Sequence, residues 1–264
     1  NDGMLMSEVE SIPDQEILVL SSRRSYLGIL RLICIIKAII QIKPDILYSF
    51  LVHSNVVSYV AGRLAGVPKL IWGLRVSRFS KDENDSKAKV VQWIAQKVSR
   101  SVDLVISNNI RGLSEYIQLG VKPRSQIVIH NGIDTDHFKT NLEFRKSFRK
   151  EIGANETDCV ICQISRIVEW KGYIYLIDAI NLLSQNNEGS IYVFVGPGKK
   201  ELINRYKAHL DRFGALSKVL WLGERQDIDR VLNGIDIFTL ASTEGEGFSN
   251  AVGEAMSTSR PVVV

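Results

Sequence analysis

The sequence is poor in the features that mark specialised classes of protein. Three cysteines in 264 residues are few and odd in number, which argues against a disulfide framework and predicts a reducing compartment, the cytoplasm. Cys159 and Cys162 form a C-x-x-C pair inside an apolar, strand-like run. Because residues three apart in a strand point to opposite faces, core packing explains the pair better than metal or redox chemistry.

Long apolar runs and blocks of like charge are also lacking. The longest apolar stretch, residues 27–42, is interrupted by Arg31 and Lys37 and is short for a bilayer span. The net charge of +4 is dispersed, so nucleic acid is not an expected partner, whereas an anionic small ligand or an anionic membrane surface would suit it. No cluster of His, Cys and Asp has metal-ligand spacing, and we expect no metal.

What the sequence does contain is the pattern of an α/β protein. Hydrophobic residues make up 45% of the chain, and short apolar runs alternate with stretches of helical periodicity. This order predicts two Rossmann-like domains around one cleft, each a parallel sheet with helices on both faces. A turn signal at Asn131-Gly132 begins a linker, which divides the chain into residues 1–139 and 140–264. The expected strands are 16–20, 46–51, 69–74, 104–107, 127–130, 160–165, 191–195, 219–222 and 235–240.

Both ends of the chain have the appearance of truncation. The first residue is Asn1 rather than Met, and the final Val262, Val263 and Val264 resemble a strand that is just beginning. We therefore expect a fragment truncated at both ends, with an incomplete first domain and a truncated second one, which need not be active by itself.

Charged residues and glycines gather after the strands of the second half. Ligands of open α/β sheets bind at the carboxyl ends of the strands, so these residues are expected to line one cleft. Cations there suit a diphosphate, and glycines allow its close approach to the backbone. The residues that follow the first three strands of the second half are Arg166, Lys171, Gly172, Gly196, Gly198, Gly223, Glu224 and Arg225.

The most informative stretch follows the last expected strand, 235–240. Glu246 lies in a glycine-bearing loop, and Glu254 lies about one turn into a helix that is expected at residues 250–257, with Ser249 or Asn250 as its N-cap. A helix N-terminus attracts anions, but carboxylates would repel phosphate, so the two glutamates suit the hydroxyls of a ribose or a sugar. Together with the cations, this turn predicts a site for a nucleotide diphosphate that carries a sugar.

At these residues the chain resembles the family-4 glycosyltransferases, which have the GT-B fold. Each segment that carries the resemblance is weak alone, and their order and spacing make the set specific. The last of them matches the family's E-x7-E signature. The segments are residues 130–134, 165–172, 195–198 and 246–256.

The resemblance implies a retaining, metal-independent glycosyltransferase without a cofactor. It would move a sugar from a nucleotide-sugar donor, UDP- or GDP-linked, to a glycan or lipid-linked hydroxyl in surface polysaccharide or glycolipid synthesis. Residues 1–139 would be the acceptor-side domain and residues 140–264 the nucleotide-sugar-binding domain. A lipid-linked acceptor would bring the cytoplasmic protein into peripheral contact with the inner membrane surface.

The resemblance also implies roles for individual residues. Arg166 and Lys171 would neutralise the leaving diphosphate, since fixed cations stabilise charge that develops in the transition state. Glu246 would contact the donor sugar and Glu254 the ribose. Backbone and side chains near the donor would come from Gly247, Phe248, Ser249, Gly196 and Gly198.

The first half matches the family less closely. His53 follows strand 46–51, in a segment where relatives carry a histidine that faces the donor sugar. Tyr48 and Phe50 stand where relatives often have further histidines, which is a departure from the pattern. Arg75, after strand 69–74, is in position to contact donor phosphate or acceptor.

Ordinary structural interpretations compete with these roles. Single arginines, lysines and glutamates are usually solvated, strand-end histidines are often structural, and G-x-G marks many turns. Joint placement favours function for Arg166, Lys171, Glu246 and Glu254, and leaves His53 evenly balanced. Structural roles are expected for His130, His137 and His209.

Other functions stay open at this point. A nucleotide-sugar epimerase of the same fold would convert a free nucleotide-sugar without an acceptor. A non-catalytic nucleotide-sugar-binding module would bind its ligand without turnover. A dinucleotide-dependent dehydrogenase fits least, because no G-x-G-x-x-G opens a strand–helix unit.

Overall fold

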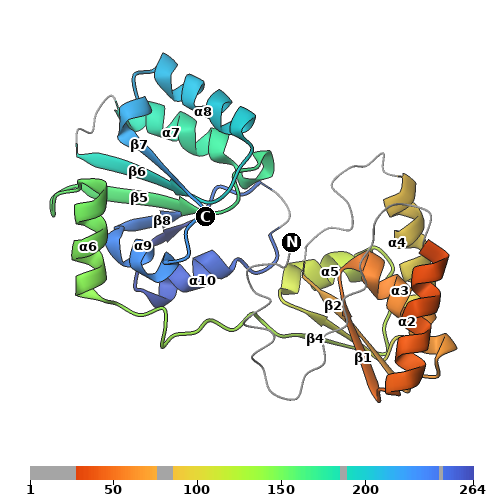
Figure 1. The fold of residues 1–264 in the computed structure, drawn as a ribbon. Helices are drawn as coiled ribbons and strands as arrows, with labels where there is room; N and C mark the ends of the chain where they lie inside the picture. The colour runs from red at the N-terminus through yellow and green to blue at the C-terminus, as the bar shows by residue number, and fades with distance from the viewer. Residues whose placement is uncertain (1–27, 76–85, 185–188, 244–245) are drawn as a thin grey trace.

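The computed structural model describes residues 28–75, 86–184, 189–243 and 246–264. They form two lobes, each with its own parallel sheet, joined by an extended segment that leads from the first lobe to the second (Figure 1). The expected strand at 16–20 lies outside the described residues. The boundary that we predict at residues 139 and 140 falls in the extended segment, between the last strand of one sheet and the first helix of the other lobe.

The first sheet is parallel throughout and has the strand order β1-β2-β3-β4. Its helices pack on β2 through Leu70, Trp72 and Leu74, which alternate along the strand and therefore point to one face. All the described helices of this lobe thus cover the same face, although the sequence predicts helices on both. The elements are α2 (Gly28–Ile42), β1 (Ile46–Phe50), α3 (Val52–Leu64), β2 (Lys69–Leu74), α4 (Ser86–Val98), β3 (Leu104–Ser107), α5 (Ile110–Gln118) and β4 (Ser125–Val128).

The second sheet is also parallel, with the order β7-β6-β5-β8-β9, and it is covered on both faces. Val193 and Val195 of β6 pack in one core with α6, α9 and α10, whereas Tyr192 and Phe194 pack in another with α7 and α8. Cys162 is buried in the first core, and burial raises the pKa of its thiol. The elements are α6 (Leu142–Ile152), β5 (Cys159–Ile164), α7 (Tyr173–Ser184), β6 (Ser190–Val195), α8 (Lys200–Arg212), β7 (Val219–Gly223), α9 (Ile228–Gly234), β8 (Ile237–Thr239), α10 (Asn250–Ser257) and β9 (Val262–Val263).

The strand order of the second sheet creates a switch point. The chain moves outward from β5 through β6 to β7, then returns to pair β8 on the other side of β5. Connections after β5 and β8 therefore leave the sheet in opposite directions, and ligands of such sheets bind at the carboxyl ends of these strands, a position that we call the crevice. The last strand, β9, contains two of the final valines, Val262 and Val263, which pair with β8.

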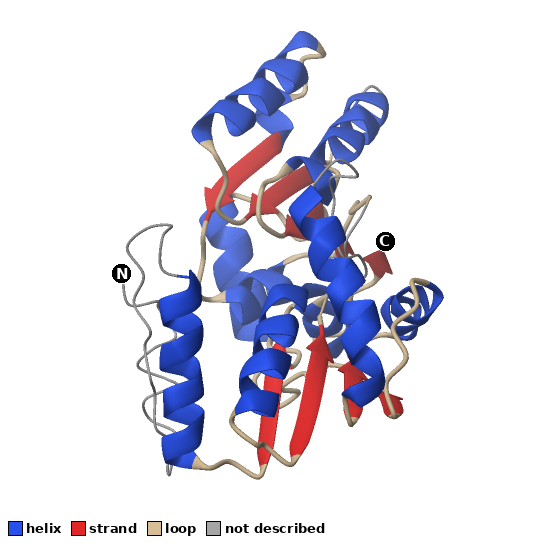
Figure 2. Ribbon diagram, turned by 90° about the vertical axis from the view of Figure 1, so that its right-hand side faces the viewer, coloured by secondary structure: helices blue, strands red, loops and turns tan. Residues whose placement is uncertain are grey.

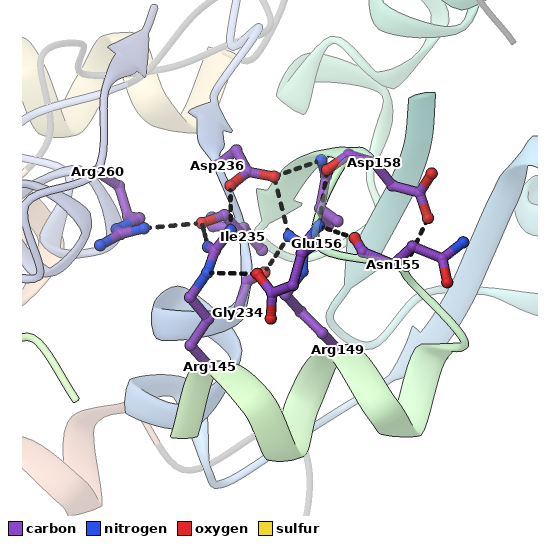
Figure 3. Close-up of polar contacts among 10 residues, drawn as sticks. Arg145, Arg149, Asn155, Glu156, Asp158, Gly234, Ile235, Asp236 and Arg260 are labelled. Carbon is purple, nitrogen blue, oxygen red and sulfur yellow. Dashed lines mark hydrogen bonds and ion pairs between the residues drawn. The ribbon is translucent and has the colours of Figure 1, made fainter. Parts of the chain in front are cut away.

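A buried polar network closes the opposite, amino-terminal edge of this sheet (Figure 3). Arg149 of α6 is only 2% exposed and donates to Asp236 Oδ2 at 3.0 Å and to the carbonyl oxygens of Gly234 and Asp158 at 3.2 and 2.7 Å. Arg145 donates to Asp236 Oδ1 at 2.9 Å. Burial raises the pKa of Asp236, but hydrogen bonds from the Val160 amide and both arginines outweigh it, and the pKa lies below its ordinary value. The network fastens α6 to the start of β5 and β8.

Candidate functional site

The loops after β5 and β8 pack tightly against each other at the switch point. The amide of Thr243 donates to the carbonyl oxygen of Trp170 at 3.0 Å. Gly172 has a positive φ of 68°, and a Cβ built on it would lie 1.7 Å from the carbonyl oxygen of Ala241. No other residue fits there without moving the backbone. The short helix η2 (Glu169–Lys171) before this glycine is thereby fixed against the loop that leads to the signature turn.

This packing brings Lys171 and Glu246 together. The two residues are 75 positions apart in the sequence, and the Lys171 ammonium donates to Glu246 Oε1 in an ion pair. Ser242 Oγ donates to the same oxygen at 2.8 Å. The side chains are 12% and 30% exposed, so the pair is partly accessible from the crevice. One predicted phosphate ligand and one predicted sugar ligand are therefore neighbours.

The aromatic ring of Trp170 lies close to both of the predicted phosphate-binding cations. Lys171 Nζ is 4.7 Å from the ring centroid, and Arg166 Cζ is 5.8 Å from it. Both distances allow a cation–π contact. Arg166 follows β5 and is exposed, so its guanidinium is accessible to an anion.

Helix α10 supplies the second glutamate of the signature. Ser249 takes the N-cap position, as predicted, with an extended backbone and without a side-chain capping bond. Glu254 is half-buried on the second turn, and burial raises the pKa of its carboxyl group, an effect that His137 partly opposes. The fold thus keeps a carboxylate where its charge is poorly compensated, which is typical of ligand-binding groups.

The signature turn also touches the first lobe. A Cβ on Gly247 would lie 2.9 Å from the carbonyl oxygen of Arg75, so only glycine permits this approach. Arg75 Nη1 donates to Asn131 Oδ1 at 2.6 Å, and Asn131 Nδ2 donates to Asn250 Oδ1 at 2.7 Å. The structure therefore joins Arg75 to the start of α10 through Asn131, a link that the turn signal at Asn131-Gly132 does not predict.

Other residues singled out in the sequence have more local surroundings. Gly196 has a φ of 137°, and a Cβ there would lie 2.0 Å from the carbonyl oxygen of Ser165. A Cβ built on Gly198 would lie 2.6 Å from the Cβ atom of Ile167. Both glycines are thus explained by the packing of the loop after β6 against the loop after β5. A direct contact with a nucleotide stays a prediction for them.

Three further residues that follow strands lie outside this cluster. His53 is exposed in the first turn of α3, after the carboxyl end of β1. Arg225 follows β7 but donates to Asp227 and Glu151, with its Nε 2.8 Å from Asp227 Oδ1, so this arginine serves packing between α6 and α9. His130 fits its expected structural role, since Nδ1 lies 2.9 Å from the carbonyl oxygen of Asn108.

Neither a metal site nor a membrane span is evident in the part of the chain that the structure describes. Its His, Cys, Asp and Glu side chains form no group of three or more that could hold a metal ion. None of its helices is long and apolar enough to cross a bilayer.

The fold and the switch-point site together define an α/β protein of the GT-B type, with two Rossmann-like sheets in separate lobes. Two family models divide the chain between them. Glycosyltransferase Family 4 matches residues 6–137, and Glycosyl transferases group 1 matches residues 144–264. The chain belongs to the family-4 glycosyltransferases.

Named relatives agree with this assignment. The UDP-Gal:alpha-D-GlcNAc-diphosphoundecaprenol alpha-1,3-galactosyltransferase of Escherichia coli is 29% identical over 237 residues, which are 88% of this chain and 60% of the relative. Alr3699/HepE of Anabaena, solved in complex with UDP and glucose, has a TM-score of 0.78 and 25% identity, over 91% of this chain and 64% of that one. A glycosyltransferase from Rickettsia africae has the same fold, with a TM-score of 0.77 and 20% identity, over 98% and 68% of the two chains. The chain spans less than two thirds of the first two proteins.

Proposed function

We propose that this chain carries the donor site of a retaining, metal-independent glycosyltransferase that uses a nucleotide-sugar. The observation that carries the proposal is the Lys171–Glu246 pair, which joins the loops after β5 and β8 at the switch point. A crevice at that position is where open α/β sheets bind nucleotides. The opposite charges match the two parts of such a donor, a diphosphate and a hydroxyl-bearing sugar.

The cations have a defined task in this proposal. Negative charge grows on the donor phosphate as its bond to the sugar breaks, and preformed positive groups lower the energy of that state. Arg166 follows β5 and is exposed, and Lys171 is less exposed and lies beside Trp170. A donor diphosphate would replace Glu246 as the partner of Lys171 and free that carboxylate for the sugar hydroxyls.

The glutamates and α10 would hold the remainder of the donor. Glu254 would accept hydrogen bonds from the ribose hydroxyls, which would compensate its poorly solvated charge. Backbone amides at Gly247, Phe248 and Ser249, at the N-terminal end of α10, would face the phosphates. We assign no nucleophile: the acceptor oxygen bonds to the anomeric carbon as the phosphate leaves, and a phosphate oxygen takes the proton of the acceptor.

The relatives guide the choice of substrates. Alr3699/HepE is solved with UDP, and the E. coli relative is named for a UDP-sugar and a diphosphoundecaprenol-linked acceptor. We propose a UDP-sugar rather than a GDP-sugar donor here, and a lipid-linked sugar acceptor of surface polysaccharide or glycolipid synthesis. Such an acceptor would bring this protein into peripheral contact with the cytoplasmic face of the membrane.

The test is transfer by the full-length protein with Arg166→Ala and Lys171→Ala. Each variant should lose at least about a hundredfold in transfer rate, as when a group that stabilises developing charge is removed. The matched control is Lys146→Ala, which removes an exposed lysine of α6 far from the crevice and should leave transfer unchanged. Unfolding curves of all three should match wild type within about 1 kcal/mol.

The same assay separates the proposal from its alternatives. Conversion of the nucleotide-sugar without any acceptor would identify an epimerase. Nucleotide binding without turnover of any donor would identify a binding module. Full transfer activity in both Arg166→Ala and Lys171→Ala would contradict the roles proposed here.

A further inference from the structure

The outer surface of the first lobe has a composition that the donor site does not explain. Helices α2, α3 and α4 lie side by side on one face of the first sheet, with α3 in the middle. In Figure 2 this side of the molecule is turned toward the viewer, and its helices stand in front of the strands. We give the name three-helix face to nine of the exposed apolar and lysine side chains of these helices: Ile33, Lys37, Ile40, Val57, Leu64, Lys89, Val90, Trp93 and Lys97.

Helix α4 is the most pronounced part of the three-helix face. Lys89, Val90, Trp93 and Lys97 are spaced by one, three and four residues and so form one stripe along the helix. Trp93 is 59% exposed, and Lys97 Nζ lies 6.0 Å from its ring centroid. An exposed tryptophan between two lysines is typical of helices that lie in the interface of a membrane.

The other two helices extend the apolar surface. Ile33 and Ile40 of α2 are 41% and 49% exposed, on either side of Lys37. On α3, Val57 is 40% and Leu64 67% exposed. Large apolar side chains gathered over three neighbouring helices exceed the single exposed residues that are normal on a protein surface.

The charged side chains of α2, α3 and α4 are all basic. The sequences of α2, α3 and α4 contain no aspartate or glutamate. Arg63 of α3 is within 3.8 Å of Asp103 at the edge of the face, and we do not count it. Lysines can extend along apolar surface and keep their ammonium groups in a layer of lipid phosphates. The acidic residues that precede α4, namely Asp82, Glu83 and Asp85, lie outside the described residues.

We propose that the three-helix face docks on an anionic phospholipid surface. Its apolar side chains would enter the headgroup region while Lys37, Lys89 and Lys97 contact lipid phosphates. A second copy of the chain fits this face less well. In a symmetric dimer the same patch meets itself, so the lysines of two copies would face one another without carboxylates between them.

Docking rests on the proposed function in one respect, since its purpose would be to hold the crevice near a lipid-linked acceptor. Binding to vesicles is measured without donor, acceptor or turnover. A failure of docking would therefore leave the donor-site proposal standing, and a failure of transfer would leave the docking proposal standing.

The experiment is co-sedimentation of the full-length protein with vesicles. Phosphatidylcholine vesicles with and without about a third phosphatidylglycerol separate an anionic lipid surface from lipid in general. Wild type should bind the anionic vesicles, bind neutral ones far less, and lose binding at high salt, since exposed charges are screened. Lys89→Glu with Lys97→Glu should weaken binding at least tenfold, given about fivefold for each lysine near the surface.

A matched control uses the second lobe. Lys200→Glu with Lys207→Glu makes the same charge change on α8, where Lys207 Nζ also lies near a tryptophan, 5.9 Å from the Trp221 ring centroid. This control should bind vesicles like wild type. Trp93→Ala should weaken binding to anionic vesicles at low salt without any change of charge, because it removes an apolar contact.

Three results would overturn the proposal. One is equal loss of binding in the α4 and α8 double variants, which would mean that only net charge matters. Another is equal binding to neutral and anionic vesicles. The third is a wild-type dimer that the α4 variant alone converts to monomers, without vesicle binding by either.

Discussion

The amino-terminal and carboxyl-terminal edges of the second sheet, where its strands begin and end, differ in how well their charged side chains are paired. At the amino-terminal edge, the Arg149 guanidinium and the Asp236 carboxylate are surrounded by partners within the protein. At the carboxyl edge, Arg166 is exposed, Lys171 and Glu246 form a pair that water can reach, and Glu254 is half-buried with little compensation. Charges that a fold satisfies internally serve the fold, whereas charges that it leaves poorly satisfied are available to a ligand.

The difference follows from the direction of the strands. Asp236 precedes β8 and Asp158 precedes β5, so both lie where α6 can cover them. The residues that follow the same strands emerge at the switch point, where the connections after β5 and β8 leave the sheet in opposite directions. One sheet therefore has a closed amino-terminal edge, where charges are paired inside the protein, and an open carboxyl edge, where we propose that the donor binds.

The largest effect should come from breaking the closed edge. Arg149→Met removes one of the three donors to Asp236 and the donor to several carbonyl groups, and should lower the free energy of unfolding by about 3–5 kcal/mol. Lys171→Met at the open edge should cost much less, because Glu246 keeps Ser242 and water as partners. Urea unfolding measures both. Equal losses of unfolding free energy in the two variants would contradict the claim that charges are better satisfied at the amino-terminal edge than at the carboxyl edge.

Acid provides an internal check on the first variant. The pKa of Asp236 is lowered in the folded protein, so its stabilising contribution is present above the unfolded pKa and is lost as pH falls through the folded pKa. The stability difference between wild type and Arg149→Met should therefore shrink as the pH falls below the range in which Asp236 is ionised.

An intermediate effect should come from Gly172→Ala, which disturbs the base of the open edge. The added Cβ would collide with the carbonyl oxygen of Ala241, so the loops after β5 and β8 would have to separate. Gly214 has the same φ of 68° and nothing within 4 Å of its would-be Cβ, which makes Gly214→Ala the matched control.

Both substitutions meet the same backbone strain, on the order of 1–2 kcal/mol, and only Gly172→Ala adds the collision. It should unfold at clearly lower urea than Gly214→Ala and bind UDP more weakly, while Gly214→Ala binds UDP as wild type does. Equal stability and equal UDP binding of the two variants would contradict the role given to Gly172 in positioning the loops after β5 and β8.

Much of the fold was predictable because local patterns determine it. The strands expected at 69–74 and 104–107 have the same limits in the structure, and the expected helix start at Asn250 is also correct. The strand expected at 235–240 is shorter, Ile237–Thr239, since Ile235 packs in a core before the strand and Asp236 joins the Arg149 network.

The candidate site was predictable only in part. Strand-end reasoning correctly brings Lys171 and Glu246 to one crevice, because parallel strands end at the same edge. The hydrogen bond between Asn131 and Asn250 joins residues 119 positions apart and depends on how the two lobes meet. No periodicity or turn signal encodes that contact. The single-sided cover of the first sheet likewise depends on tertiary arrangement rather than on any local pattern.

The smallest stability effect, and the most direct test of the open edge, concerns Glu254. Burial raises its pKa in the folded protein, so its contribution to stability is full below the unfolded pKa and is lost as pH rises through the folded pKa. At neutral pH the charged carboxylate therefore opposes folding slightly. Glu254→Gln keeps the shape without the charge.

The decisive measurement is the Tm of wild type and Glu254→Gln at neutral pH, with and without UDP. Without UDP, the variant should be as stable as wild type or slightly more so. With UDP at about a hundred times its Kd, wild type should gain about 2.7 kcal/mol, and the variant should gain far less. A variant that is destabilised when free, yet protected by UDP as strongly as wild type, would show that Glu254 serves the fold and would contradict the account.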